Sequence, residues 1–236
     1  MKLRDKLGAL RNSPINVNLA PNSASSEFEI NNWRISELVI DKVVPGVGIH
    51  PFPLNELLLM TGAVARFKPS LIFEWGTHIG KSALAFYRIS QALGIKTTIH
   101  SIDLPDDIEH GEHPHKDRGR LVKNLPVKLH QGDGLNTALD ILNKSKKNPR
   151  GKNALFFIDG DHSYESVKRE LKGIIKDAPE AAILLHDTFY QSPDSGYNVG
   201  PYRAIEDCLS KSARKYKRVD TATGLPGMTL LYPDEH

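Results

Sequence analysis

The sequence has 236 residues, a formal net charge of +3 and a single cysteine, Cys208. This length suits one α/β domain with its own core. Such a small charge does not indicate nucleic-acid binding. A single cysteine cannot form a disulfide within the chain, which is consistent with a reducing compartment. No apolar run reaches the ~18 residues of a membrane span, and the basic N-terminus lacks the apolar core of a secretory signal. We therefore expect a cytoplasmic protein.

An N-terminal arm with a short helix is expected over residues 1–50, ahead of the main domain over 51–236. Residues 12–32 are rich in Asn, Ser and Pro without periodicity, which indicates a loose arm; a lid or a dimer contact is the alternative. The apolar spacing from Trp33 predicts a helix that stops before Pro45, because a residue that precedes proline disfavours the helical conformation.

A second helix is predicted over 54–67, followed by a strand, a glycine turn and a helix in the stretch LIFEWGTHIGKSA. The apolar start is typical of a buried parallel strand, and Glu74 follows it. Gly76 and Gly80 would let the backbone approach a ligand closely. The spacing reads E-x-G-x-x-x-G-x-S, so it matches neither the dinucleotide G-x-G-x-x-G nor the P-loop. A purely structural turn is the alternative.

Two more acidic residues follow predicted strands. Asp103 comes after the strand predicted over 97–102, where a carboxylate can accept both hydroxyls of a ribose. An N-cap or loop aspartate is the alternative. Asp133 follows the strand predicted over 127–130, inside a Gly-Asp-Gly turn.

The insertion over 104–119 contains three histidines, at positions 110, 113 and 115, together with several acidic residues. A zinc site is conceivable, but the insertion has no cysteine and no common zinc spacing. A mobile, solvated loop over the pocket is the favoured interpretation.

Polar side chains crowd the ends of two strands predicted over 154–158 and 181–185. They are Asp159, Asp161 and His162 after the first strand, and His186 and Asp187 after the second. Because neighbouring parallel strands end at one edge of a sheet, we expect Asp159 and Asp187 to share a cleft. Two carboxylates there repel each other unless a cation or a proton intervenes. Mg²⁺ suits the oxygen ligands, whereas the imidazole of His186 suits Mn, Fe or Zn better.

The two residues between these strands have different expected roles. With a reference pKa near ~6.5, His162 can accept a proton at neutral pH, unless it only makes a backbone hydrogen bond. Asp161 is interpreted as the cap of a helix predicted over 163–175.

The C-terminal part predicts a closing hairpin, with strands over 216–222 and 228–232. The polar and aromatic loop over 189–200 is expected to shape a binding pocket. A helix from Pro201 to about Ala213 follows it, because proline suits the first turn of a helix.

These motifs resemble those of the class I S-adenosylmethionine-dependent methyltransferases. The glycine stretch is similar to their motif I, Asp103 to motif II, and Asp133 to the turn that contacts adenine. The pattern D-G-D-H-x-Y, followed by a strand ending in H-D-T, resembles the metal-dependent O-methyltransferases of the cephalosporin-hydroxylase-like and macrolide-sugar groups. Relatives often have Glu or Asp where this chain has His186. The resemblance covers roughly residues 50–232.

The resemblance implies a Rossmann-like class I methyltransferase fold, a seven-stranded mixed sheet with helices on both faces and an antiparallel last strand. It implies S-adenosylmethionine bound by Glu74, Gly76, Thr77, Gly80, Ser82, Asp103 and Asp133. It also implies a divalent metal held by Asp159, His186 and Asp187, with His162 as the general base.

The reaction expected from this resemblance is metal-assisted O-methylation of a small hydroxylated acceptor, such as a sugar or a natural-product hydroxyl. A metal-independent methyltransferase, acting on nitrogen for example, is one alternative. A cofactor-binding accessory protein without methyltransferase activity is another. We expect a small-molecule partner, no nucleic acid, no membrane association and possible homodimerisation.

Overall fold

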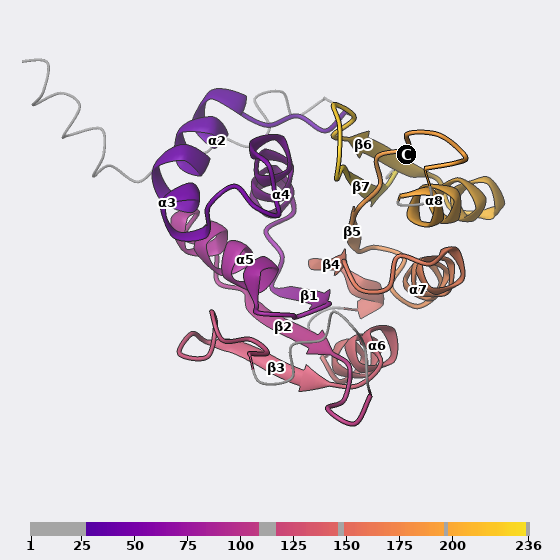
Figure 1. Ribbon diagram of the computed structural model, residues 1–236, viewed down its shortest axis with the longest axis horizontal. Coiled ribbons are helices and arrows are strands. Elements are labelled where there is room, and N and C mark those ends of the chain that lie inside the picture. Colours follow the sequence, from indigo (N-terminus) through magenta and orange to yellow (C-terminus); the bar gives the residue numbers. More distant parts are fainter. Residues whose placement is uncertain (1–26, 109–116, 146–148, 196–197, 235–236) are drawn as a thin grey trace, which may run out of the picture.

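The computed structural model describes residues 27–108, 117–145, 149–195 and 198–234. The predicted loose arm lies largely outside these ranges, as do the three histidines of the predicted loop at 110, 113 and 115. A seven-stranded sheet in the order β3-β2-β1-β4-β5-β7-β6 forms the centre, and helices cover both of its faces (Figure 1). The fold expected from the sequence is therefore confirmed.

The strands are β1 Leu71–Trp75, β2 Thr98–Asp103, β3 Val127–Gln131, β4 Ala154–Ile158, β5 Ala182–His186, β6 Tyr216–Asp220 and β7 Met228–Pro233. The helices are α2 Asn32–Leu38, the π-helix η1 Val39–Val43, α3 Val44–Val47, α4 Leu54–Phe67, α5 Lys81–Ala92, α6 Gly134–Lys144, the short 3₁₀ helix η2 Pro149–Gly151, α7 Tyr164–Asp177 and α8 Val199–Lys211. Strands β1 to β5 pair in parallel, whereas β7 is antiparallel to both β5 and β6.

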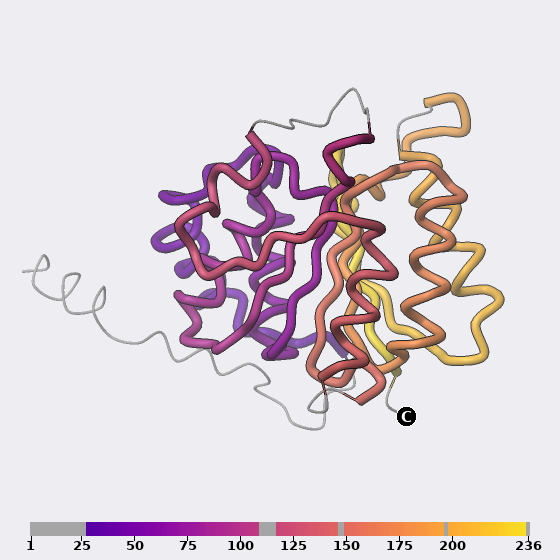
Figure 2. Tube along the Cα trace, turned by 90° about the horizontal axis from the view of Figure 1, so that it is seen from below, coloured from indigo at the N-terminus to yellow at the C-terminus, as the bar shows by residue number. Residues whose placement is uncertain are grey.

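Successive residues of the central strands point to opposite faces of the sheet, as the pleat requires. Ile72 and Phe157 pack against α4 and α5, whereas Phe73 and Phe156 pack against α6, α7 and α8. Strands β4 and β5 are buried along their whole length, which explains their continuous apolar sequences. Figure 2 shows the same layers from a second direction.

The register of the parallel strands aligns their carboxyl ends. Trp75, the last residue of β1, pairs with Ile102 on one side and Ile158 on the other, and Ile158 is next to Leu185 across β4 and β5. The residues that follow these strands therefore meet at one edge, where ligands bind in open α/β sheets. None of the helices in the described ranges has the length and apolar character needed to cross a membrane.

The helix predicted to stop before Pro45 continues past it, so that prediction is wrong. After α2 the backbone widens into η1, where the N–H of Val44 bonds to the carbonyl of Val39, and α3 then runs to Val47. Pro45 lies in the first turn of α3, where the missing N–H removes no hydrogen bond within the helix. The loop begins at Gly48, whose φ is 77°. Ile35 and Val43 of this segment lie in the same core as α4 and α5.

The predicted cap of α7 is also corrected. Ser163 is the N-cap, and its side chain accepts a hydrogen bond from the N–H of Ser166. Asp161 lies two residues earlier and accepts hydrogen bonds from the N–H and the hydroxyl of Ser163. Asp161 therefore holds the capping serine in place and does not cap the helix itself.

Candidate active site

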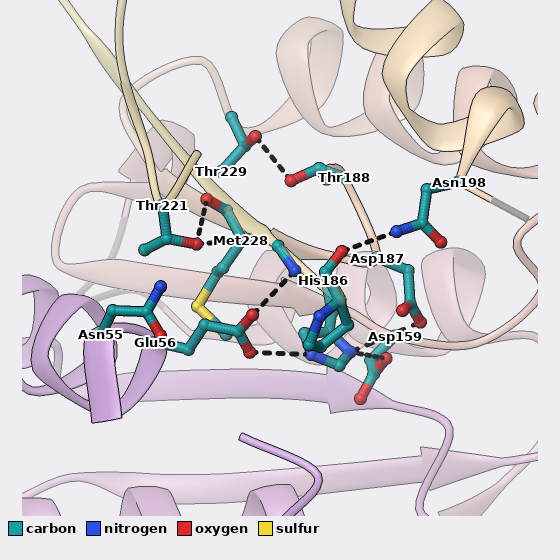
Figure 3. Close-up of polar contacts among 12 residues, drawn as sticks. Asn55, Glu56, Asp159, His186, Asp187, Thr188, Asn198, Thr221, Met228 and Thr229 are labelled. Atoms are coloured by element: carbon teal, nitrogen blue, oxygen red, sulfur yellow. Dashed lines mark hydrogen bonds and ion pairs between the residues drawn. The ribbon is translucent and has the colours of Figure 1, made fainter. Parts of the chain in front are cut away.

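Asp159, His186 and Asp187 come together at the carboxyl ends of β4 and β5. Each residue offers one ligand atom, and these atoms all lie within 4.8 Å of one another. The Nδ1 of His186 is 2.9 Å from Oδ1 of Asp159 and 3.5 Å from Oδ2 of Asp187. The expectation that the two aspartates come together at this edge of the sheet is therefore confirmed by the geometry (Figure 3).

Asp187 has an unusual backbone and an unsatisfied oxygen. Its φ is 55°, in the left-handed region that non-glycine residues rarely adopt and that often occurs at functional sites. Its Oδ1 is buried, without a hydrogen-bond partner among the described residues. A buried carboxylate oxygen without a partner is costly, which makes it a candidate for binding a cation.

His162 completes the cluster from the start of α7. Its Nε2 is 3.0 Å from Oδ2 of Asp187 and 3.7 Å from Oδ1 of Asp159. Burial lowers the pKa of His162, but hydrogen bonds and charge from Asp159 and Asp187 outweigh it and raise the pKa to about 10. A cation held by the two aspartates would offset their negative charge, and His162 could then accept a proton near neutral pH.

Glu56 of α4 also belongs to the cluster, although the sequence analysis did not identify it. It is 1% exposed, its Oε2 lies 3.0 Å from Nε2 of His186, and its Oε1 accepts a hydrogen bond from the N–H of Gly227 at 2.8 Å. Phe52 lies edge-on to the imidazole, with 5.0 Å between the ring centroids. An acidic residue in the first turn of a helix is usual, so nothing in the sequence pattern indicates this contact.

The histidines and acids of the cluster offset one another's charge. Burial alone would lower the pKa of His186, but the neighbouring carboxylates of Asp159, Asp187 and Glu56 raise it well above its ordinary value. Burial would raise the pKa of Asp187, but hydrogen bonds from His162 and His186 hold it well below its usual range. The cluster therefore suits proton transfer and cation binding alike.

The glycine turn lies directly beside this cluster. Gly76 has a φ of 89°, and a Cβ at this position would lie 2.0 Å from the carbonyl oxygen of Asp159. Gly80 also has a φ of 89°, and its Cβ would lie 3.0 Å from Val122. The hydroxyl of Thr77 bonds to that of Ser101 at 2.7 Å and fixes the turn to β2. The turn is thus built for close approach of backbone segments.

Glu74 is fully buried at the end of β1, facing the start of α5. Ser82 donates its hydroxyl to Oε2 of Glu74 at 2.8 Å, whereas Oε1 has no hydrogen-bond partner in the part of the chain that is described. Burial raises the pKa of Glu74 to about 7, although hydrogen bonds from Ser101 and Ser82 oppose the rise. An unpaired, buried carboxylate oxygen can bind a cationic group of a ligand.

Asp103 and Asp133 both lie at strand ends on the same edge, and both already have protein partners. Asp103 accepts hydrogen bonds from the N–H groups of His78 and Leu104, and Arg118 lies 3.6 Å from its carboxylate. Asp133 caps α6, and its carboxylate lies 2.6 Å from Arg169. Ribose and adenine contacts by these residues stay predictions, and they would have to share or replace these partners.

Comparison with known proteins supports the same class. Residues 73–188 match the model of a family described as a methyltransferase domain. No curated protein matches the chain.

Solved structures resemble the fold over most of the chain. An O-methyltransferase from Bacillus cereus in complex with SAH has a TM-score of 0.55 at 16% identity, covering 84% of this chain and 90% of that one. The O-methyltransferase TomG from Streptomyces achromogenes, in complex with SAM, has a TM-score of 0.54 at 17% identity, with coverages of 86% and 88%. An SAH-bound methyltransferase from Podospora anserina has a TM-score of 0.53 at 18% identity, with coverages of 98% and 94%.

The sheet order, the antiparallel β7 and the glycine turn after β1 define a class I methyltransferase architecture. Residues 73–188 therefore match a methyltransferase domain, and the fold around them is that of the class I methyltransferases.

Proposed function

We propose that the protein transfers the methyl group of S-adenosylmethionine to a hydroxyl of a small acceptor, with a divalent cation held by Asp159, His186 and Asp187. One observation carries the proposal. The glycine turn and the acidic cluster are in contact, because Gly76 leaves room only for the carbonyl of Asp159. A methyl donor on that turn would therefore lie next to the three candidate ligands.

The proposed cofactor site consists of the turn after β1 and the ends of β2 and β3. It includes Glu74, Gly76, Thr77, Gly80, Ser82, Asp103 and Asp133. The unpaired Oε1 of Glu74 suits the ammonium group of the methionine part, because a charged hydrogen bond there would satisfy a buried oxygen. Asp103 is assigned to the ribose and Asp133 to the adenine.

The donor set fits a divalent cation. It provides two carboxylates and one imidazole, and it includes the unsatisfied Oδ1 of Asp187. When bound, such a cation lowers the pKa of an acceptor hydroxyl and orients it. A mixed oxygen and imidazole set favours Mn, Fe or Zn over Mg, which prefers oxygen alone.

The protein's own part is to position the groups and to move one proton. As the acceptor oxygen forms its bond to the methyl carbon, the hydroxyl proton passes to Nε2 of His162, and S-adenosylhomocysteine leaves. The His162 side chain is 34% exposed, but its Nε2 is buried 3.0 Å from Oδ2 of Asp187, so the acceptor hydroxyl has to displace that contact. A groove of about 890 Å³ beside it, lined by His162, Tyr164, Pro193, Val199, Arg203 and Asp207, is the proposed route for a polar acceptor.

A metal-independent methyltransferase is the second candidate, and one observation favours it. His186 and His162 are within hydrogen-bonding distance of the carboxylates, and their pKa values are raised, so imidazolium groups can balance the charge of Asp159 and Asp187. In this case no cation is required to relieve the repulsion between the aspartates.

Manganese binding separates the two candidates. We expect the protein to bind Mn²⁺ in electron paramagnetic resonance titrations, and EDTA to abolish methyl transfer from labelled S-adenosylmethionine to hydroxylated acceptors. Asp159→Asn should lower Mn²⁺ affinity by more than the ~10–100-fold typical of outer-shell changes. Asp161→Asn is the matched control, because Asp161 accepts hydrogen bonds from Ser163 and is not one of the candidate ligands, so Mn²⁺ affinity should be unchanged. Full activity in EDTA would contradict the metal-dependent mechanism.

A further inference from the structure

The imidazole of His186 is held from both sides. Its Nδ1 faces the carboxylates of Asp159 and Asp187, and its Nε2 faces Oε2 of Glu56 at 3.0 Å (Figure 3). Nδ1 is therefore the ring nitrogen available to the shared space between the two aspartates. Rotation of the ring would break the contact with Glu56.

Glu56 is itself fixed by a second contact. Its Oε1 accepts a hydrogen bond from the N–H of Gly227, in the turn between β6 and β7. Gly227 and Pro226 also accept hydrogen bonds from the N–H groups of Thr188 and Phe189, which directly follow Asp187. Glu56 thus ties α4 to the β6–β7 turn and, through that turn, to the segment after β5.

The chemistry of these contacts sets the direction of the hydrogen bond to His186. A carboxylate accepts but does not donate, so the contact at Nε2 requires that nitrogen to carry a proton. Nδ1 faces Oδ1 of Asp159 in the same way, so it also carries a proton in the metal-free site, and a bound cation would take the place of that proton. Metal-binding histidines generally have such a carboxylate partner on the other ring nitrogen, which orients the ring and selects the tautomer.

We propose that Glu56 is the positioning residue of this site: it holds the Nε2 proton of His186 and presents Nδ1 to the space shared with Asp159 and Asp187. The inference rests on the proposed function as far as the cation is concerned. The orientation of the ring is independent of it, and this makes the two claims separable by experiment.

Glu56→Gln tests the proposal with little change in shape. The amide oxygen of Gln can still accept from the N–H of Gly227, which leaves its NH₂ group facing Nε2 of His186. An NH₂ group donates, so Nε2 should lose its proton while Nδ1 keeps the proton that it donates to Asp159, and the lone pair should then lie on the wrong side of the ring. We expect Mn²⁺ affinity to fall ~10–100-fold while the melting temperature and S-adenosylmethionine affinity stay close to wild type.

Asn55→Ala is the matched control on the same helix turn. Asn55 donates to the hydroxyl of Thr223 at 2.9 Å and has no contact with His186, so its loss should leave Mn²⁺ affinity unchanged. An equal loss of Mn²⁺ affinity in both variants would assign Glu56 a purely structural role and overturn the proposal.

Nitrogen-15 NMR of the His186 ring gives a readout that does not depend on metal binding. We expect protons on both ring nitrogens in the metal-free wild type and loss of the Nε2 proton in Glu56→Gln. If the wild type binds no Mn²⁺ but Nε2 still loses its proton in Glu56→Gln, the metal-dependent function fails and the role of Glu56 stands. If the proton stays on Nε2 in the variant, the proposal is wrong.

Discussion

The glycine turn after β1 and the histidine–aspartate cluster after β5 lie on the same edge of the sheet but are built differently. In the turn, Glu74 and Ser82 bond to each other across 8 positions of the sequence. In the cluster, Glu56 and His186 are 130 positions apart, and Glu56 and Gly227 are 171 apart. The turn is thus a local motif, whereas the cluster depends on the completed fold.

Gly76→Ala should have the largest effect on stability and ligand binding, because Gly76 belongs to the turn and touches the cluster. A Cβ would lie 2.0 Å from the carbonyl oxygen of Asp159, at a φ of 89°. Strain and overlap together should cost roughly 3–5 kcal/mol of unfolding free energy, measured in urea. Binding of S-adenosylmethionine and of Mn²⁺ should both be lost in calorimetric titrations.

Gly94→Ala separates backbone strain from overlap. Gly94 also has a positive φ, 66°, but a Cβ there would meet nothing within 4 Å. Gly94→Ala should lower the free energy of unfolding by only about 1–2 kcal/mol, and the variant should still bind S-adenosylmethionine and Mn²⁺. If Gly76→Ala behaved like Gly94→Ala, the two regions would not be mechanically connected.

Glu74→Gln should change the turn alone, with an effect that depends on pH. The carboxyl of Glu74 has its pKa raised from 4.5 to about 7 in the folded protein. Folding therefore retains a proton that the unfolded chain releases, so stability falls as the pH rises from 4.5 to 7 and stays lower above that. Gln does not ionise, and the variant should be more stable than wild type by up to ~3 kcal/mol at pH 8 and nearly equal at pH 4.

The same substitution should weaken S-adenosylmethionine binding by ~10–100-fold, as expected for loss of a charged hydrogen bond. Mn²⁺ affinity should be unchanged, because Glu74 is not part of the cluster. Thermal melting across the pH range, together with calorimetric titration of both ligands, checks these expectations. A variant that is less stable at pH 8 would mean that burial of Glu74 does not cost free energy.

The local parts of the structure were predictable from the sequence. The helix over 54–67 and the strand over 154–158 have the predicted bounds, because apolar periodicity and flanking loop residues define both. The pairing of Asp159 with Asp187 followed from the rule that parallel strands end at one edge.

Other features depend on contacts that the sequence does not encode locally. Glu56 looks like an ordinary first-turn acid, and only the fold brings it to His186. The continuation of the helix past Pro45 required the π-helix η1, which has no clear sequence signal. Asp103 and Asp133 lie at the predicted strand ends, but their bonds to Arg118 and Arg169 come from other segments.

Ser163→Ala and Asp161→Ala should have the smallest effects on stability, and neither should alter ligand binding in either region. Ser163 caps α7 by accepting from the N–H of Ser166, and losing a serine cap costs about 1 kcal/mol. Asp161→Ala removes the hydrogen bonds that hold Ser163 in place and a favourable charge near the start of the helix. It should lower the free energy of unfolding by roughly 0.5 kcal/mol. Urea unfolding of both variants measures the difference. If Asp161→Ala were the more destabilising, Asp161 would be the true cap and the sequence prediction would be restored.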